Sequence, residues 1–210
     1  MRHGNQTDIF LADPGHKVFI VWAGSVGSMV CYTLAQMWFT NIAVCDFDEV
    51  EDHNIAQQFY KEADCGVQKV VALQENIKAF TWTDIFVHDG AYDPAMTEGY
   101  DIVILAVDSM EVRKQVVETA EPTIWFVDAR MAGEYFEIYT FHNDWVGTDL
   151  WEDTWYSDDE ADHEKCTAKG IAYNTHIIAG IVAKNTTSLF EDNLVPFKVA
   201  FDLKNLIMET

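Results

Sequence analysis

Hydrophobic residues in the N-terminal part of the chain alternate between strand-like and helix-like patterns. Lys17 to Trp22 is a short run of β-branched and aromatic residues, which is typical of a buried strand. Ser25 to Trp38 carries apolar residues at helical spacing, and Asn41 to Cys45 is a second apolar run of strand length. A strand, a helix and a strand within about thirty residues form one βαβ unit.

The same alternation continues through the middle of the chain. The strand-like run from Asp101 has hardly a polar residue, as expected of a central parallel strand that helices cover on both faces. Ser109 is expected to cap the helix that follows it. The pattern predicts an α/β fold with a doubly wound, Rossmann-like and mostly parallel sheet. The expected elements are helices at Gly66 to Phe80 and Ser109 to Ala120, and strands at Asp84 to His88, Asp101 to Val107 and Thr123 to Asp128.

The pattern changes after this parallel core. Glu134 to Phe141 alternates polar and apolar residues, which predicts an antiparallel strand with one solvated face. Residues 144–165 are rich in Asp, Glu and Trp, and we predict a solvated crossover loop there. A long helix from Thr167 to Ser188 and a last strand from Pro196 to Leu203 complete an antiparallel C-terminal extension. We therefore expect one domain over residues 1–210, with a core at about 17–143, an acidic crossover at 144–165, and a C-terminal helix and strand at 166–210.

The charge of the chain excludes one class of partner. The formal net charge is -22, from 13 basic and 35 acidic residues. Nucleic acid is not an expected partner, because contacts to phosphates need many lysines and arginines. Such a charge suits either a high-salt environment or a basic protein partner, and the sequence does not choose between them.

The location of the protein is predicted from two segments. Residues 18–38 are mostly apolar and close to membrane-span length, but the glycines near Gly24 fit a strand, a turn and a buried helix better. Met1 to Gly15 lacks the charged and then apolar pattern of a signal peptide. We therefore expect a cytoplasmic protein with no membrane segment.

The turn after the first strand has the composition of a nucleotide site. Gly24 and Gly27 would let a phosphate approach the backbone at the positive end of the following helix. Asp46 ends the second strand, where a carboxylate can accept hydrogen bonds from ribose hydroxyls. Trp22 stands where a complete G-x-G-x-x-G pattern would have its first glycine. The alternative is a buried βαβ turn that binds nothing.

The segments that follow carry a family resemblance. Asp46 to Gln58 reads D-x-D-x-V-x-x-x-N-I-x-Q-Q, close to the D-x-D-x-V-x-x-x-N-L-x-R-Q pattern of the ThiF/MoeB and ubiquitin-activating superfamily. Gly66-x-x-Lys69 resembles its G-x-x-K element, and Ala106 to Ser109, followed by Arg113, resembles its A-x-D-[NS] strand end. Asp128-Ala129-Arg130 is similar to phage and bacterial members. The resemblance covers about residues 17–190 in consistent order.

The resemblance implies an enzyme that uses ATP and Mg²⁺. Asp46 would hold the ribose, Asn54 and Lys69 would contact the triphosphate, and Asp108 would serve Mg²⁺. The reaction would be adenylation of the C-terminal carboxylate of a small ubiquitin-like or sulfur-carrier protein by a homodimer. Lys69 and Asp108 would be catalytic. The nucleotide-binding set would be Gly24, Gly27, Asp46, Asp48, Asn54, Gln58 and Lys69.

Other interpretations of these residues remain. Lys69 on its own fits a solvated helix residue, and Asp108 fits a helix cap. Gln57 replaces the arginine of the family pattern, which leaves no cation there to neutralise pyrophosphate. Together with the bulk of Trp22, this leaves a second hypothesis beside the enzyme, a catalytically silent scaffold or partner subunit that binds a carrier or another activating domain. A third, an NAD-dependent oxidoreductase, fits less well, because the segments after the turn contain no hydride-transfer site.

The cysteines add one candidate nucleophile. Cys166-Thr167 resembles the Cys-Thr pair of ubiquitin-activating enzymes, whose thiol accepts the activated carboxylate as a thioester. A cysteine without a chemical role at a helix start is the alternative. His163 and Cys166 lack a matching second pair of ligands, and there is no C-x-x-C, so zinc is not expected. Cys31 and Cys45 fall on apolar stretches and are expected to be reduced core residues.

Overall fold

A single mixed sheet forms the centre of the molecule in the computed structural model, which describes residues 5–158 and 171–210. The strand order is β3-β2-β1-β4-β5-β6-β7-β8, and the first five strands in this order are parallel. The last three join antiparallel, as predicted for the C-terminal extension. The strands are β1 (Lys17–Val21), β2 (Asn41–Asp46), β3 (Phe86–Asp89), β4 (Ile102–Leu105), β5 (Trp125–Ala132), β6 (Tyr135–His142), β7 (Lys198–Asp202) and β8 (Ile207–Glu209).

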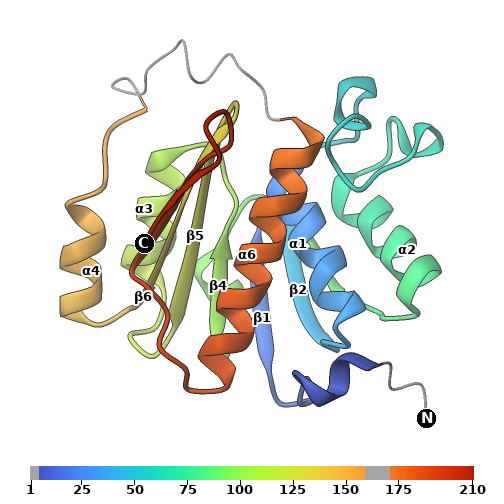
Figure 1. Cartoon of the computed structure of the whole chain (residues 1–210). Coiled ribbons are helices and arrows are strands. Elements are labelled where there is room, and N and C mark those ends of the chain that lie inside the picture. Colours follow the sequence, from blue (N-terminus) through green and yellow to red (C-terminus); the bar gives the residue numbers. More distant parts are fainter. Residues whose placement is uncertain (1–4, 159–170) are drawn as a thin grey trace.

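Helices cover both faces of the sheet (Figure 1). Alternation along β1 divides the core, because successive side chains of a strand point to opposite faces. Val18 and Ile20 join the core under α1, α2 and α6, whereas Phe19 and Val21 join the core under α3 and α4. The α-helices are α1 (Ser25–Gln36), α2 (Lys69–Thr81), α3 (Met110–Thr119), α4 (Trp145–Glu152) and α6 (Ala172–Phe190). The 3₁₀ turns are η1 (Asn5–Asp8), η2 (Asp52–Asn54), η3 (Glu62–Asp64) and η4 (Pro94–Thr97).

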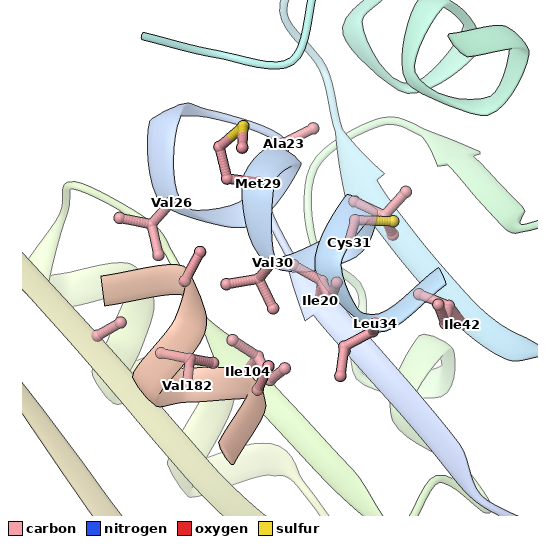
Figure 2. Packing of buried hydrophobic residues seen from close by; sticks show 14 of the residues in the cluster. Ile20, Ala23, Val26, Met29, Val30, Cys31, Leu34, Ile42, Ile104 and Val182 are labelled. Atoms are coloured by element: carbon pink, nitrogen blue, oxygen red, sulfur yellow. The ribbon is translucent and has the colours of Figure 1, made fainter. Parts of the chain in front are cut away.

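Helix α1 packs against the sheet and beside α6 on the same face (Figure 2). Val30 and Leu34 on α1 are fully buried, together with Ile20 of β1 and Val182 of α6. Burial of one such side chain stabilises the fold by about 1.5–3 kcal/mol. Because α1 is packed on two sides, its first turn is fixed above the end of β1, at the predicted nucleotide turn.

The structure corrects one predicted element. Residues 145–152 of the expected crossover loop form helix α4 instead. The carboxylate of Asp144 accepts a hydrogen bond from the backbone N–H of Gly147 and caps this helix, while Trp151 is buried to 1% exposure. An N-cap and one large apolar anchor are enough to order a short helix against the sheet. The rest of the predicted crossover from residue 159 lies outside the described residues.

Other element boundaries shift for local reasons. Helix α2 begins at Lys69 instead of Gly66, because Gly66 has a φ of +81°, a left-handed conformation outside a helix. Strand β5 continues to Ala132 because β6 pairs with its full length. In the described part of the chain, no helix combines the length and apolar character needed to cross a membrane.

Candidate nucleotide site at the carboxyl edge of the sheet

The strand order has a switch point at β1, where the chain changes direction across the sheet. Strand β1 lies between β2 and β4, and the connections from β1 and β4 run to helices on opposite faces. Ligands of doubly wound folds bind at the carboxyl ends of strands beside such a switch point. Gly24, Asp46 and Asp108 follow or end these three strands, so the fold brings the predicted residues to one edge.

Asp46 holds the turn between β1 and α1. Its Oδ2 accepts a hydrogen bond of 2.8 Å from the backbone N–H of Ala23, and its Oδ1 accepts one of 2.8 Å from Asp48. Burial raises the pKa of Asp46, while the N–H of Asp48 and the ammonium group of Lys69 oppose that rise. The side chain is 2% exposed, which leaves little of the carboxylate open to a ribose.

The two glycines of the turn have different roles. A Cβ at Gly27 would overlap the backbone carbonyl oxygen of Trp22, so Gly27 is required for close packing of α1 against the end of β1. A Cβ at Gly24 would meet no atom within 4 Å. Gly24 is the N-cap of α1, and no side chain caps this helix end. The open backbone at Gly24 therefore fits a phosphate, whereas Gly27 serves the fold.

Lys69 is a buried residue beside this turn. Its Nζ lies 2.7 Å from Oδ2 of Asp48, and the lysine side chain is 9% exposed while that of Asp48 is 50% exposed. The backbone N–H of Lys69 also donates to the carbonyl oxygen of Asp48. This contradicts the alternative of a solvated helix lysine. A buried ammonium group paired with a half-exposed carboxylate retains the capacity to contact a second anion.

The segment between β2 and α2 packs over the turn. Asn54 is buried, and its Oδ1 accepts from the N–H of Glu51 at 2.8 Å. The hydroxyl of Tyr60 donates to the carbonyl oxygen of Ala23 at 2.7 Å, a contact that no sequence pattern indicated. The Oε1 atoms of Gln57 and Gln58 are buried without a hydrogen-bond partner among the described residues. Such atoms cost stability unless a further group binds them, which is consistent with a ligand or partner site.

Asp108 is an exposed carboxylate that follows β4. It does not cap α3, because Ser109 is the N-cap and accepts a hydrogen bond from the N–H of Val112, as predicted. The carboxylate of Asp158 also binds the N-terminus of α3, because it accepts hydrogen bonds from the Ser109 hydroxyl at 2.8 Å and from the Met110 N–H at 2.7 Å. The helix-cap alternative for Asp108 is therefore wrong, and its carboxylate remains available for Mg²⁺.

The described residues contain no preformed cluster of metal ligands, at Asp108 or away from it. Within residues 5–158 and 171–210, no three histidine, cysteine or acidic side chains converge on a point that could hold a metal ion. Mg²⁺ commonly binds through one or two carboxylates together with phosphate oxygens and water. The exposed Asp108 fits that kind of site.

The Arg113 and Asp128-Ala129-Arg130 matches form a buried structural cluster. Asp128 is fully buried between the guanidinium groups of Arg113 and Arg130 and accepts a hydrogen bond from the indole N–H of Trp151. Burial alone would raise the pKa of Asp128, but the two arginines outweigh it and the pKa lies below its ordinary value. Arg130 also donates to Thr154. This cluster fixes α4 and the following residues against the carboxyl edge.

The side chain of Trp22 points away from the first turn of α1. Its φ is +75°, the left-handed conformation that glycine adopts easily. Its ring packs with the core on the face away from α1 and meets Phe47 edge to face, with centroids 5.6 Å apart. No atom of the ring comes within 4 Å of a Cβ at Gly24. The sequence identified the substitution but not the direction of its side chain.

The structure describes three of the four cysteines. Cys31 and Cys45 are buried and unpaired, as predicted, and burial raises the pKa of both thiols, that of Cys45 to about 12. Cys65 is exposed. Cys166 and His163 lie outside the described residues, so the thioester role of Cys166 stays a prediction.

Two surface hollows occur at the opposite edge of the sheet. One is lined by Asp101, Trp125 and Phe190, and the other by Phe86 and Tyr100, all close to the amino ends of strands or to the end of α6. Ligands of doubly wound folds bind at the carboxyl ends instead. We therefore locate the candidate site at Gly24, Lys69 and Asp108.

Known structures share this architecture. PaaA matches with a TM-score of 0.75 and 21% identity, over 92% of this chain and 62% of PaaA. The MccB protein of E. coli, in a structure with ATP, matches with a TM-score of 0.70 and 14% identity, over 93% of this chain and 63% of MccB. At these identities the similarity establishes the fold alone.

Sequence comparison gives the family. The adenylyltransferase and sulfurtransferase MOCS3 of Dictyostelium discoideum is 29% identical over 139 residues, which cover 60% of this chain and 32% of MOCS3. The chain thus spans about a third of that relative's length. Residues 14–208 match the ThiF family. The order of segments from the glycine turn to the C-terminal strands agrees with that match, and the chain belongs to the ThiF family.

Proposed function

We propose that this domain catalyses ATP-dependent adenylation of the C-terminal carboxylate of a small ubiquitin-like or sulfur-carrier protein. The observation that carries the proposal is the first turn of α1, which no side chain caps and which is open at Gly24. Hydrogen bonds of Asp46 to the N–H groups of Ala23 and Asp48, and the ion pair of Asp48 with Lys69, hold the buried lysine beside this turn. A helix N-terminus and a lysine at one strand edge are suited to a polyphosphate. The ThiF family membership supports the same function.

The nucleotide would lie along this edge. The backbone at Gly24 and the ammonium group of Lys69 would bind phosphates, and the acidic end of β2 would receive the ribose. Asn54 and Gln58 would complete the contacts, since the buried Oε1 of Gln58 lacks a partner in the described part of the chain. Asp108 would hold Mg²⁺, which neutralises phosphate charge when bound.

The reaction needs charge stabilisation more than a strong base. A carboxylate oxygen of the carrier would attack the α-phosphorus, the bond to the oxygen that bridges the α- and β-phosphorus would break, and pyrophosphate would leave. The products are an acyl-adenylate and pyrophosphate. Negative charge grows on the leaving group, so Lys69 and the first N–H groups of α1 would act by binding it. By analogy with the family, we propose a homodimer, with Cys166 as the residue that could next accept the acyl group.

A second function is favoured by Gln57. The residue is neutral where the family pattern has an arginine, and its Oε1 is buried without a partner among the residues described. A domain that keeps the nucleotide fold but lacks this cation could act as a scaffold that binds a carrier or another activating domain. The two functions differ in whether pyrophosphate is released.

Pyrophosphate exchange tests the proposal. With Mg²⁺ and a ubiquitin-like or sulfur-carrier protein, wild type is expected to exchange labelled pyrophosphate into ATP, and Asp108→Ala is expected to abolish exchange. Ser109→Ala is the matched control, since it removes the cap of α3 and costs about 1 kcal/mol of stability without removing the carboxylate. Titration calorimetry should show tighter binding of ATP than of NAD. Binding of ATP without exchange would favour the scaffold, and a clear preference for NAD would exclude both.

A further inference from the structure

We propose that the ring of Phe47, supported edge to face by Trp22, forms an aromatic platform on which the purine base of the bound nucleotide stacks. This inference rests on the proposed nucleotide site and adds the residues that read the base. It also gives a role to Trp22, the residue whose bulk in the glycine turn argued against binding.

The backbone of Trp22 is held in place independently of its ring. Its N–H donates to the carbonyl oxygen of Cys45 at 2.8 Å, which ties the end of β1 to β2. The φ of +75° turns the side chain away from α1 and toward the end of β2. There the Trp22 and Phe47 rings meet at 87°, the edge-to-face arrangement that aromatic pairs prefer.

Phe47 presents apolar surface at the site. It follows Asp46 directly, and the residue is 50% exposed. A half-exposed phenylalanine beside a half-buried tryptophan is an apolar patch at the acidic end of β2. A flat apolar ligand would bury this surface favourably.

The connectivity of a nucleotide directs the base to this patch. The ribose carries its phosphates on C5′ and its base on C1′, on opposite sides of the ring oxygen, with the two hydroxyl groups between them on the other edge. With phosphates at Gly24 and the hydroxyls at the acidic end of β2, we infer that the base extends away from α1. The Trp22 ring lies on that side, since it packs with the core of the opposite face.

Stacking on this platform predicts that the affinity for a nucleotide depends on its base. Aromatic side chains bind every base through its π-face, and loss of one such contact weakens binding by about ten-fold. Purines offer a larger face than pyrimidines, so ATP should bind more tightly than CTP. Inorganic tripolyphosphate has no base, so its affinity should not depend on the platform.

The experiment measures equilibrium binding of ATP, CTP and tripolyphosphate to the full chain with Mg²⁺. Phe47→Ala and Trp22→Gly are each expected to weaken the binding of ATP by about ten-fold and to reduce the preference for ATP over CTP. The affinity for tripolyphosphate should not change. Glycine suits the positive φ of position 22, so the fold should survive. Phe86→Ala is the matched control, because Phe86 is 56% exposed on β3 and lines the hollow at the opposite edge.

Fluorescence provides a second readout. A base stacked on Phe47 would lie beside the Trp22 ring and should quench its emission, whereas Trp22→Phe should retain ATP affinity and lose that part of the quench. Unchanged ATP affinity in Phe47→Ala, or tighter ATP binding in Trp22→Gly, would overturn the platform while leaving the phosphate site intact. Equal losses for ATP and tripolyphosphate would also overturn it. Failure of wild type to bind either ligand would overturn the proposed function, and the platform with it.

Discussion

The ammonium group of Lys69 lies 2.7 Å from the carboxylate of Asp48, whose backbone N–H, like that of Ala23, donates to the carboxylate of Asp46. Strand β2, helix α2 and the turn into α1 therefore meet through three side chains. The lysine is the buried partner and the aspartate the half-exposed one. This arrangement fixes the position of a positive charge beside the open end of α1, on a chain whose net charge is -22.

Loss of the Lys69 charge should weaken ATP binding without unfolding the domain. Lys69→Met keeps the length of the side chain, and one lost charge-assisted contact corresponds to a decrease in affinity of about ten-fold or more. Lys78→Met is the control, since Lys78 lies on the same helix and pairs with Asp84 at the same distance of 2.7 Å, but with an exposed side chain. Calorimetry should show a loss for Lys69→Met alone. Equal affinities in both variants would place the phosphates elsewhere.

The two glycines of the turn should respond oppositely to alanine. Gly27→Ala would force a Cβ into the Trp22 carbonyl, so we expect a loss of stability of about 1–3 kcal/mol or more, visible as a lower Tm. Gly24→Ala meets no protein atom and should keep the Tm of wild type. It should instead weaken ATP binding, because the methyl group would occupy the space open to a phosphate. Unaltered ATP affinity in a folded Gly24→Ala would contradict this assignment.

The buried carboxylate of Asp128 should give the domain a pH-dependent part of its stability. Its pKa lies below the ordinary value because Arg113 and Arg130 outweigh the effect of burial, so the contribution is present above about pH 4 and lost as the pH falls further. Asp128→Asn leaves two arginines without their carboxylate and should cost about 3–5 kcal/mol near neutral pH.

Urea denaturation over a pH series measures this effect. The difference between wild type and Asp128→Asn should shrink as the pH falls below about 4. Asp144→Asn is the control, because asparagine also caps helices well and position 144 is at the exposed start of α4. A difference that stays constant with pH would mean that packing, and not charge, accounts for the loss.

The parallel core was predictable because its signals are local. Apolar runs at β1 and β4 and helical spacing in α1 need no information on distant residues. Helix α4 was missed because its acidic and tryptophan-rich sequence resembles a solvated loop, and only the contact between Trp151 and Asp128 shows why it folds. The role of Tyr60 and the direction of the Trp22 ring also depend on contacts between distant segments. Sequence patterns identify residue types at strand ends, but not which neighbours those side chains meet.

A thioester role for Cys166 predicts a covalent adduct. In the presence of ATP and an adenylated carrier, wild type should form an adduct that thiols cleave, and Cys166→Ala should not. The exposed Cys65 could react nonspecifically, so both proteins are best compared in a Cys65→Ser background. Cys31 and Cys45 are buried and should not interfere. Mass spectrometry that finds adenylate but no adduct would assign Cys166 to structure.

Gln57 separates the enzyme from the scaffold. An arginine at this position would offset charge that develops on the pyrophosphate and would also replace a side chain whose Oε1 is buried without a partner among the described residues. In a slow enzyme, Gln57→Arg should raise pyrophosphate exchange by about ten-fold or more, since a charge-assisted contact is worth about 1.5–3 kcal/mol. Gln57→Leu removes the amide without adding charge and should not raise it.

Two other outcomes have distinct meanings. If a second subunit supplies the missing cation, for which Arg2 near the N-terminus is the candidate, Gln57→Arg should change little. Removal of residues 1–8 should then abolish exchange while ATP binding persists. If the domain is a scaffold, neither Gln57→Arg nor any carrier should produce exchange, although ATP should still bind at Gly24 and Lys69. Because a Cβ at Gly24 would meet no atom within 4 Å, we expect the phosphate turn to admit the nucleotide despite Trp22. Restored exchange in Gln57→Arg would therefore identify the missing charge as the sole chemical deficit of the site.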